Sequence, residues 1–411
     1  MFMAERLHYG RVQFLKKWKS LIRGSEEATM EFGFTAEQLM FRDTIYRYAK
    51  NEIVHLCEEA DWKAEFSHEL WEKFQCMGLL SLPFPEEYGG QGADTITCTL
   101  AGEALAHAGV DQGHLLAMGA HTYLCGDTIF RNGTEEQKRK YIPKIASGEW
   151  IGCMGLTEPG AGSDAASLQT FAVKKGDRWL LNGTKTFITN APVADVAVIF
   201  ATVDKAKKHK GITAFIVEKS FKGFSTGNPL HKMGVRASAT SEIFFDDCEV
   251  PEENLLGEVG KGFLMALQTV EWDRSALLGP YVGGLRFAME EAARYANERI
   301  QFGRTIQSFQ AIRHKIADMK IIVEACKLAV YRVAALKDQG QPLNQLQASI
   351  AKAFLGDWGM KAASEAVQVF GGYGYMHEYP VERMLRDQKL AQIGGGTSEI
   401  QRLVISRLML S

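Results

Sequence analysis

The stretch QTFAVKKGDRWLLNGTKTFITNAPVADVAVIFATV, residues 169–203, differs in character from the sequence on either side of it. β-branched and aromatic residues alternate there with polar residues, which is the period of a half-buried strand. Gly176-Asp177 and Asn182-Gly183 are pairs that favour two-residue hairpin turns. The runs GITAFIVEKS and SEIFFDDCEV continue the pattern to about residue 250. We therefore expect residues 151–252 to form a β-domain, either a small barrel or a sandwich.

Helical periodicity marks both flanks of this β-domain. Before it, apolar residues recur at helical spacing from residue 34 to residue 145, and Thr35 with Gln38 forms a capping-box pattern at the start. After it come long alanine-rich segments whose wide apolar faces are typical of a helical bundle with subunit contacts. The fold class is thus α+β in the order α, β, α. The predicted parts are a basic extension (1–30), an N-terminal helical domain (31–150), the β-domain (151–252) and a C-terminal helical bundle (253–411).

Composition excludes several classes of protein. Hydrophobic residues make up 46% of the 411 residues and charged residues 23%, and the net charge of −2 gives no electrostatic reason to expect nucleic acid. The sequence contains no run of 18 apolar residues, so no membrane span is predicted. Seven dispersed cysteines without a C-x-x-C pair argue against a disulfide framework and a metal site, and favour a reducing compartment.

The first 23 residues contain six basic residues and one acid. They are either an organellar transit peptide or a short basic extension ahead of a folded part that starts near Met30. We expect a cytoplasmic bacterial protein, with the mitochondrial matrix as the alternative location.

Three glycine-rich stretches are candidates for a binding site. GLTEPGAGSD (155–164) lacks the spacing of a phosphate loop and is equally compatible with a plain turn. QVFGGYGYMHEYPVERMLRD (368–387) places Gly371-Gly372 at a helix end. GGGTSE (394–399) opens the last helix, with Ser398 and Gln401 in capping-box spacing. Bare backbone at a helix start allows close approach of an anionic group to free N–H groups.

Together with TFITN (186–190), ERIQFG (298–303), FQAIRHKIADM (309–319) and MGVRASATSEIFFDDCEVPEENLLG (233–257), these stretches resemble the acyl-CoA dehydrogenase family. The resemblance runs from about residue 34 to the last residue. It implies oxidation of an acyl-CoA thioester to the 2-enoyl-thioester with FAD as cofactor. It also implies a homotetramer and an electron-transfer flavoprotein as electron acceptor.

The resemblance assigns positions around FAD and the substrate. Leu156, Thr157, Gly162 and Ser163 would line the isoalloxazine, and Phe187 and Thr189 would cover its other side. The positions that would reach the pyrophosphate and adenosine from the adjacent chain are Arg299, Gln310, Gln368, Gly371 and Gly372. Thr397 and Glu399 would hold the dinucleotide at the last helix. Ser163, Glu271, Arg274, Asp94 and Gly395 correspond to positions at the substrate.

The catalytic base is the point at which this sequence departs from many family members. The glutamate that usually precedes GTS is Gly395 here. Another branch of the family carries its carboxylate on the first C-terminal helix, before an arginine, and the matching residue is Asp273, followed by Arg274. No basic residue lies three or four positions from Asp273, so a helical ion pair is excluded and desolvation would raise its pKa. The alternative is that Asp273 forms a tertiary salt bridge or caps a turn near Pro280.

Aspartate is shorter than glutamate, and Gly395 has no side chain, so we expect a roomy acyl pocket. Such a pocket would suit a branched or alicyclic acyl group, with a medium or long chain as the alternative. Asp94 is a second acid near the pocket, with a solvated turn residue as the alternative. Because position 395 lacks its acid, a non-catalytic flavoprotein of the same fold is the rival function.

Overall fold

The computed structural model describes residues 33–341 and 345–410, without the side chains of residues 270–273. The predicted basic extension (1–30) therefore lies wholly outside the described residues. The described residues from Met40 onward form one compact unit. Among the described residues, no helix combines the length and apolar character that a membrane crossing requires.

The N-terminal part is helical, as predicted. Its helices are α2 (Ala36–Glu52), α3 (Val54–Lys63), α4 (His68–Cys76), α5 (Thr95–Ala108), α6 (Gln112–Gly119), the π-helical segment η2 (Ala120–Gly126), α7 (Asp127–Asn132) and α8 (Glu135–Ser147). The predicted capping box is confirmed. The backbone N–H of Gln38 donates to Thr35 Oγ1 and the backbone N–H of Thr35 donates to the side-chain oxygen Oε1 of Gln38, both at 3.1 Å.

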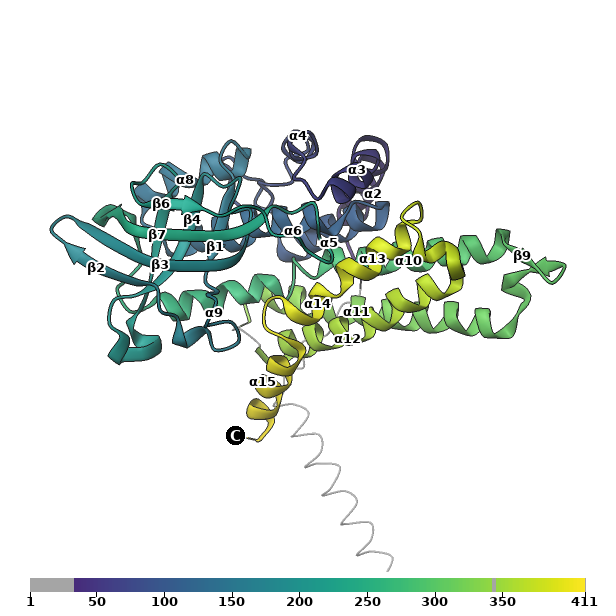
Figure 1. Cartoon of the computed structure of the whole chain (residues 1–411). Helices are drawn as coiled ribbons and strands as arrows, with labels where there is room; N and C mark the ends of the chain where they lie inside the picture. The colour runs from purple at the N-terminus through teal and green to yellow at the C-terminus, as the bar shows by residue number, and fades with distance from the viewer. Residues whose placement is uncertain (1–32, 342–344, 411) are drawn as a thin grey trace, which may run out of the picture. The chain divides into compact units, whose positions relative to one another are not determined.

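The β-domain is one sheet folded over on itself. Its strands are β1 (Gly152–Gly155), β2 (Phe171–Lys175), β3 (Arg178–Thr189), β4 (Val196–Thr202), β5 (Ile212–Glu218), β6 (Phe224–Thr226), β7 (Thr240–Pro251) and β8 (Leu255–Leu256). They lie in the order β6-β7-β3-β2-β4-β5-β8, and β1 pairs with β4 in parallel (Figure 1). Only the pair Phe171 and Thr202 joins β2 to β4, so the sheet bends there into two packed halves.

Side chains on the inner faces of these halves form one buried cluster. Trp179, Ile188 and Phe245 from β3 and β7 meet Ile199 and Phe215 from β4 and β5. The outer face of β4 and β5 packs on helices instead, in a second cluster that includes residues of α8 and of the later helix α9 (Gly262–Asp273). Every residue of β4 is consequently buried, which explains its unbroken apolar run.

One of the two predicted hairpin turns is wrong. Gly176-Asp177 does join β2 to β3, where Lys175 pairs with Arg178. Asn182-Gly183 lies inside β3, at a register shift against β7. A Cβ atom at Gly183 would come within 2.5 Å of Thr170 Oγ1, and Gly183 has a φ of +144°. This glycine therefore serves a close backbone approach at a bulge and not a turn.

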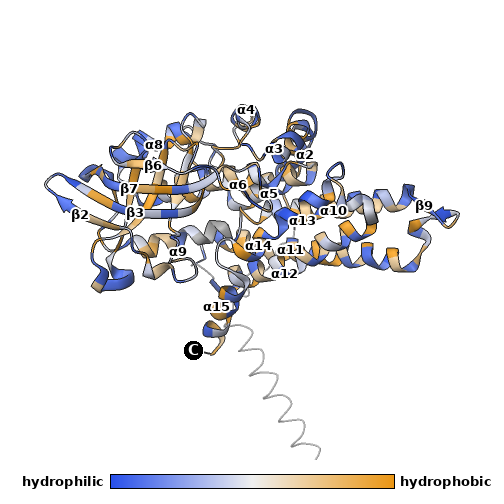
Figure 2. Ribbon diagram, in the orientation of Figure 1, coloured by the Kyte–Doolittle hydropathy of each residue, from blue (hydrophilic) through white to orange (hydrophobic). Residues whose placement is uncertain are grey.

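The C-terminal part is a bundle around a single buried cluster. Its elements after α9 are α10 (Gly279–Glu298), β9 (Ile300–Gln301), β10 (Arg304–Thr305), α11 (Gln310–Asp338), α12 (Gln345–Phe370), η7 (Gly371–Tyr375), α13 (Pro380–Gln388), α14 (Leu390–Ile393) and α15 (Ser398–Leu410). Figure 2 shows both apolar and polar residues along α15, where Leu403, Leu408 and Met409 are exposed. An exposed apolar helix face is typical of an association surface.

His121 in η2 ties the N-terminal helices to the sheet. Its Nε2 donates to the Ile145 carbonyl at 2.9 Å and its Nδ1 accepts from the Gly152 amide at 2.9 Å. The ring is fully buried, and desolvation lowers its pKa from 6.5 to about 4. The folded state therefore keeps His121 neutral at a pH where the unfolded chain protonates it.

We expect this histidine to make the protein sensitive to acid. Because its pKa is lower in the folded state, its contribution is complete above pH 6.5 and decreases as the pH falls toward about 4. The loss should be roughly 1.5 kcal/mol between pH 6.5 and pH 5, because the slope reaches about 1.4 kcal/mol per pH unit only below pH 6.5. Urea unfolding at both pH values, compared between wild type and His121→Asn, measures it. An equal loss in the variant would contradict this assignment.

Candidate functional site

A strained, exposed aromatic residue marks one wall of the candidate site. The β3–β7 register shifts between Lys185 and Ile188, and Phe187 in that shift has a φ of +57° and a side chain that is 69% exposed. A non-glycine residue in the left-handed region costs free energy, and such residues concentrate at functional sites. Asn190 holds the end of the segment, because its Nδ2 donates to the carbonyls of Ala117 and Gly152.

The loop that contains Leu156, Thr157, Gly162 and Ser163 is fixed from beneath by a buried ion pair. Lys185 Nζ lies 2.7 Å from Glu158 Oε1 and donates to the Leu156 carbonyl at 3.2 Å. The Glu158 carboxylate also accepts the Gln169 and Thr170 amides. Burial acts to raise the pKa of Glu158, but Lys185 and these donors outweigh it and lower that pKa.

The 156–163 loop is hydrogen-bonded to β3, the strand that carries Phe187. The backbone amide of Thr186 donates to the Thr157 carbonyl at 2.9 Å. Gly162 and Ser163 are exposed, and nothing lies within 4 Å of a Cβ built at Gly162. The structure thus places open backbone beside the Phe187 segment. Thr189 is half-buried and pairs with Thr240 of β7.

The glycine loop before α15 has a cap that differs from the prediction. Thr397, and not Ser398, caps the helix, because Thr397 Oγ1 accepts the Ile400 amide at 3.3 Å. Gln401 Nε2 donates to the carbonyls of Gly396 and Gly395. Ser398 Oγ instead donates to Asp357 of α12, so its hydroxyl is not available to cap. Gly395 and Gly396 have φ values of +62° and +87°, which favour glycine.

The end of α9 lies beside this glycine loop. Arg274 follows α9 directly, and its Nη2 is 4.0 Å from a Cβ built at Gly396, while its Nη1 donates to Ser349 Oγ at 3.2 Å. The side chains of Asp273 and Glu271 lie outside the described residues. The Arg274 side chain, next to Asp273 in sequence, thus reaches the loop that contains position 395.

Asp94 and Glu399 occupy helix starts. Asp94 caps α5 by accepting the Thr97 amide at 2.7 Å, and its role at the substrate remains a prediction. Glu399 is exposed in the first turn of α15, where hydrogen bonds from its own amide and from Thr397 lower its pKa. Both carboxylates therefore already stabilise a helix N-terminus.

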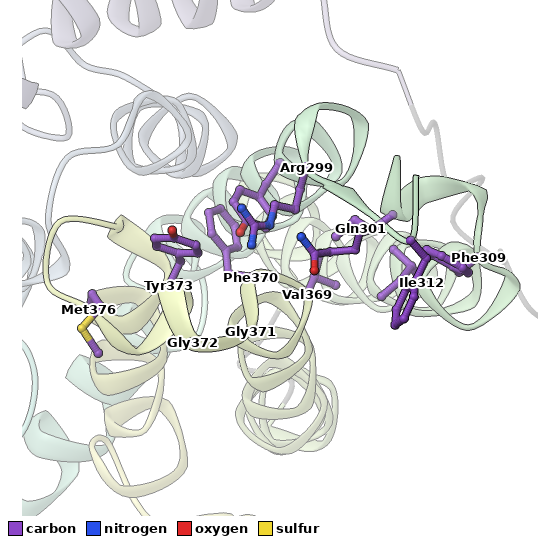
Figure 3. Close-up of a pocket in the computed structure, with 13 residues that line it drawn as sticks. Arg299, Gln301, Phe309, Ile312, Val369, Phe370, Gly371, Gly372, Tyr373 and Met376 are labelled. Carbon is purple, nitrogen blue, oxygen red and sulfur yellow. The ribbon is translucent and has the colours of Figure 1, made fainter. Parts of the chain in front are cut away.

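A second group of predicted residues lines a cavity of about 660 Å³ at the far end of α10 (Figure 3). Arg299, Gly371 and Gly372 line it, and the Arg299 guanidinium lies 5.2 Å from the centre of the Tyr373 ring. Gln310 and Gln368 are exposed next to the lining residues Phe309 and Val369. Nothing lies within 4 Å of a Cβ built at Gly371 or Gly372.

This cavity lies far from Arg274 within one chain. Arg274 precedes α10 and Arg299 follows it, and 20 helical residues span roughly 30 Å. Arg274 and the cavity beside Arg299 therefore lie at opposite ends of α10.

Sequence reasoning missed the residues that support these loops, namely Lys185, Glu158 and Asp357. A signal existed for Lys185, because a lysine in an apolar strand needs a buried partner. No local pattern pointed to Asp357, whose partners are 35 to 45 positions away.

Comparison with known proteins covers almost the whole chain. Family models described as the N-terminal, middle and C-terminal domains of acyl-CoA dehydrogenase match residues 35–149, 153–248 and 260–410. A short-chain-specific acyl-CoA dehydrogenase of Clostridium acetobutylicum is 45% identical over 92% of this chain and 99% of its own length. Subunit CarC of the caffeyl-CoA reductase-Etf complex of Acetobacterium woodii is 41% identical over 92% of this chain and 99% of its own.

The solved structure of butyryl-CoA dehydrogenase from Megasphaera elsdenii matches with a TM-score of 0.89 and 40% identity, covering 93% of this chain and 100% of that one. These matches confirm the α, β, α fold and the family that the glycine-rich motifs indicated. The chain belongs to the acyl-CoA dehydrogenase family, a family of FAD-dependent oxidoreductases.

Proposed function

We propose that this chain oxidises a branched or alicyclic acyl-CoA to its 2-enoyl-CoA, with Asp273 as the base. The observation that carries the proposal is that the Arg274 side chain, adjacent to Asp273 in sequence, reaches the Gly395-Gly396 loop at Gly396. In the family resemblance, both positions face the carbon that loses its proton. Only one of them, Asp273, carries a carboxylate in this sequence.

The residues of this chain fit FAD. Open backbone at Gly162 and at Gly371-Gly372 leaves room for close approach. Phe187 offers an exposed ring next to the first loop, and Arg299 offers a cation at the cavity for a diphosphate. When bound, FAD supplies the acceptor for the C3 hydride.

Asp273 would take the C2 proton on the opposite face from the cofactor. A base at this position must lie within hydrogen-bond reach of the carbon acid. Backbone N–H of the glycine loop would hold the thioester carbonyl and stabilise the negative charge that develops on it. The other predicted substrate contacts are Ser163, Glu271, Arg274 and Asp94.

A basic segment supports CoA as the carrier of the acyl group. The 3₁₀ segment η4 (Lys205–Gly211) contains Lys207, Lys208 and Lys210, all exposed. His209 in η4 lies 5.9 Å from the Phe263 ring at the start of α9. Because α9 has 12 residues, roughly 18 Å separates this segment from Asp273, so an extended thioester arm along α9 would place its phosphates near the lysines.

Replacing Lys207, Lys208 and Lys210 together with glutamine should raise KM for acyl-CoA by about tenfold, a change of roughly 1.4 kcal/mol. The turnover number should stay within about twofold, because these residues do not touch the reacting carbons. Steady-state kinetics measure both constants. The same acyl group on N-acetylcysteamine, which lacks phosphates, should show no change, and a Lys174, Lys175 and Lys219 triple variant is the control. An equal effect on both thioesters would refute the phosphate contact.

We also propose a homotetramer in which each FAD site is completed by the adjacent chain. The separation of Arg274 from the Arg299 cavity by the length of α10 supports this assembly, as do the exposed apolar residues of α15. An electron-transfer flavoprotein is the proposed electron acceptor, since a relative 41% identical to this chain is named as a subunit of an Etf complex. Light scattering on the purified protein tests the assembly, and reduction of added electron-transfer flavoprotein tests the acceptor.

Anaerobic bleaching of the bound flavin tests the function as a whole. A panel of straight, branched and cyclic acyl-CoAs should include at least one that bleaches the flavin, with faster bleaching by branched or cyclic groups. Faster bleaching by butyryl-CoA would leave the reaction in place and overturn the substrate class. A flavin that no acyl-CoA bleaches would favour the non-catalytic flavoprotein.

A further inference from the structure

One carboxylate on α12 holds both ends of the glycine loop. Asp357 Oδ1 accepts Gln392 Nε2 at 2.9 Å, before the loop, and Ser398 Oγ at 3.0 Å, after it. Its other oxygen, Oδ2, pairs with Arg402 one helical turn into α15. Asp357 therefore joins α14, α15 and α12 at the point where Gly394–Thr397 crosses between them.

The packing around Asp357 leaves the loop little freedom to shift toward α12. A Cβ built at the preceding residue, Gly356, would lie 2.9 Å from the Ala391 carbonyl oxygen and 3.3 Å from Ser398 Oγ. Gln401 is fully buried and donates to the Gly395 and Gly396 carbonyls of the loop. Gly395 itself is exposed. The loop is thus fixed at both ends and has an exposed backbone at Gly395, one residue from the contact with Arg274.

The charge of Asp357 suits this holding role. Burial acts to raise the pKa of its carboxyl, but the hydrogen bonds from Arg402, Gln392 and Ser398 outweigh that effect and lower it. The carboxylate is thus ionised at neutral pH, and hydrogen bonds to a charged acceptor are stronger than neutral ones.

From these contacts we infer that Asp357 is a positioning residue for the dehydrogenation, which sets the backbone of Gly394–Thr397 against the end of α9. The inference rests on the proposed function, because position 395 carries no acid and its glycine can contribute to the reaction only through its backbone. A displacement of about 1 Å in such a group can cost roughly a hundredfold in rate. Asp357 does not touch the substrate, so the binding constant should change much less.

The test is single-turnover reduction of the bound flavin by the best acyl-CoA of the panel. Asp357→Ala should lower the limiting reduction rate constant by about 30- to 100-fold, while the acyl-CoA dissociation constant changes less than about threefold. Asp357→Asn keeps an oxygen for Gln392 and Ser398 and should stay within about fivefold of wild type. Glu365→Ala is the matched control, since Glu365 lies on the same helix and pairs with Lys315.

The outcomes separate this inference from the proposed function. If the wild type bleaches and Asp357→Ala reduces at the wild-type rate, the positioning role is refuted and the function stands. Equal losses in the alanine and asparagine variants, or a loss confined to acyl-CoA binding, would also refute it. Should Asp357→Ala fail to fold, Ser398→Ala removes one of the three hydrogen bonds and should lower the rate constant by about three- to tenfold. A wild type that never bleaches refutes the proposed function itself.

Discussion

The Asp273→Asn variant is expected to reduce its flavin with acyl-CoA about a thousandfold more slowly than wild type, because a positioned general base contributes roughly a hundred- to ten-thousandfold. Asparagine keeps the shape of the side chain and removes its basicity. FAD should remain bound, since none of the predicted cofactor contacts is altered. Stopped-flow absorbance of the flavin under anaerobic conditions measures the rate, and the visible spectrum measures occupancy.

Two comparisons make this result specific. Asp246→Asn, at an exposed position on β7, should behave as wild type. Adding Gly395→Glu to Asp273→Asn should restore part of the rate, because the family resemblance places both positions at the same carbon and Arg274 reaches this loop at Gly396. Restoration should be incomplete, since a glutamate at a φ of +62° is strained by roughly 1 kcal/mol or more. An Asp273→Asn protein that bleaches normally would exclude Asp273 as the base.

The Lys185→Met variant should be the most strongly destabilised of these proteins. It leaves the Glu158 carboxylate, which is 5% exposed, without its ammonium partner, and breaking a buried pair costs about 3–5 kcal/mol. It also removes the hydrogen bond to the Leu156 carbonyl, so the first glycine loop should bind FAD more weakly. Urea unfolding measures the stability, and recovery of flavin fluorescence on dilution measures FAD release.

A double variant distinguishes loss of the pair from loss of packing. Combining Lys185→Met with Glu158→Gln removes the unpaired negative charge of Glu158. We expect the double variant to recover at least half of the unfolding free energy that the single variant loses. FAD affinity should stay low in the double variant, because the contact to Leu156 is still absent. A single variant as stable as wild type would show that the pair contributes nothing to the fold.

The architecture was predictable from local patterns. Period-two alternation in residues 169–203 and helical periodicity on both flanks gave the α, β, α order, and Thr35 with Gln38 gave a correct capping box. These signals depend on neighbours in sequence, and each element then buries the face that its period defines. The unbroken apolar run of β4 also followed from burial on two sides.

The errors have a tertiary origin. Asn182-Gly183 has the composition of a turn, but Thr170 from another segment requires a glycine at a bulge. Ser398 has the spacing of a cap, but Asp357 from α12 binds its hydroxyl and Thr397 takes over. The supporting residues beneath both loops act through partners far away in sequence. A single sequence does not show such pairings, because they arise only when the helices and the sheet pack together.

The double-sided burial of β4 limits how this protein can be divided. Three family models match consecutive stretches of the chain, which invites expression of the middle stretch by itself. A fragment of residues 153–248 would expose Val196, Val198 and Phe200, which the helices of α8 and α9 normally cover. Such a strand is a template for aggregation. The middle stretch that the family model matches is therefore not an autonomous folding unit. A chimera that exchanges this stretch between relatives should also need to exchange the flanking helices α8 and α9.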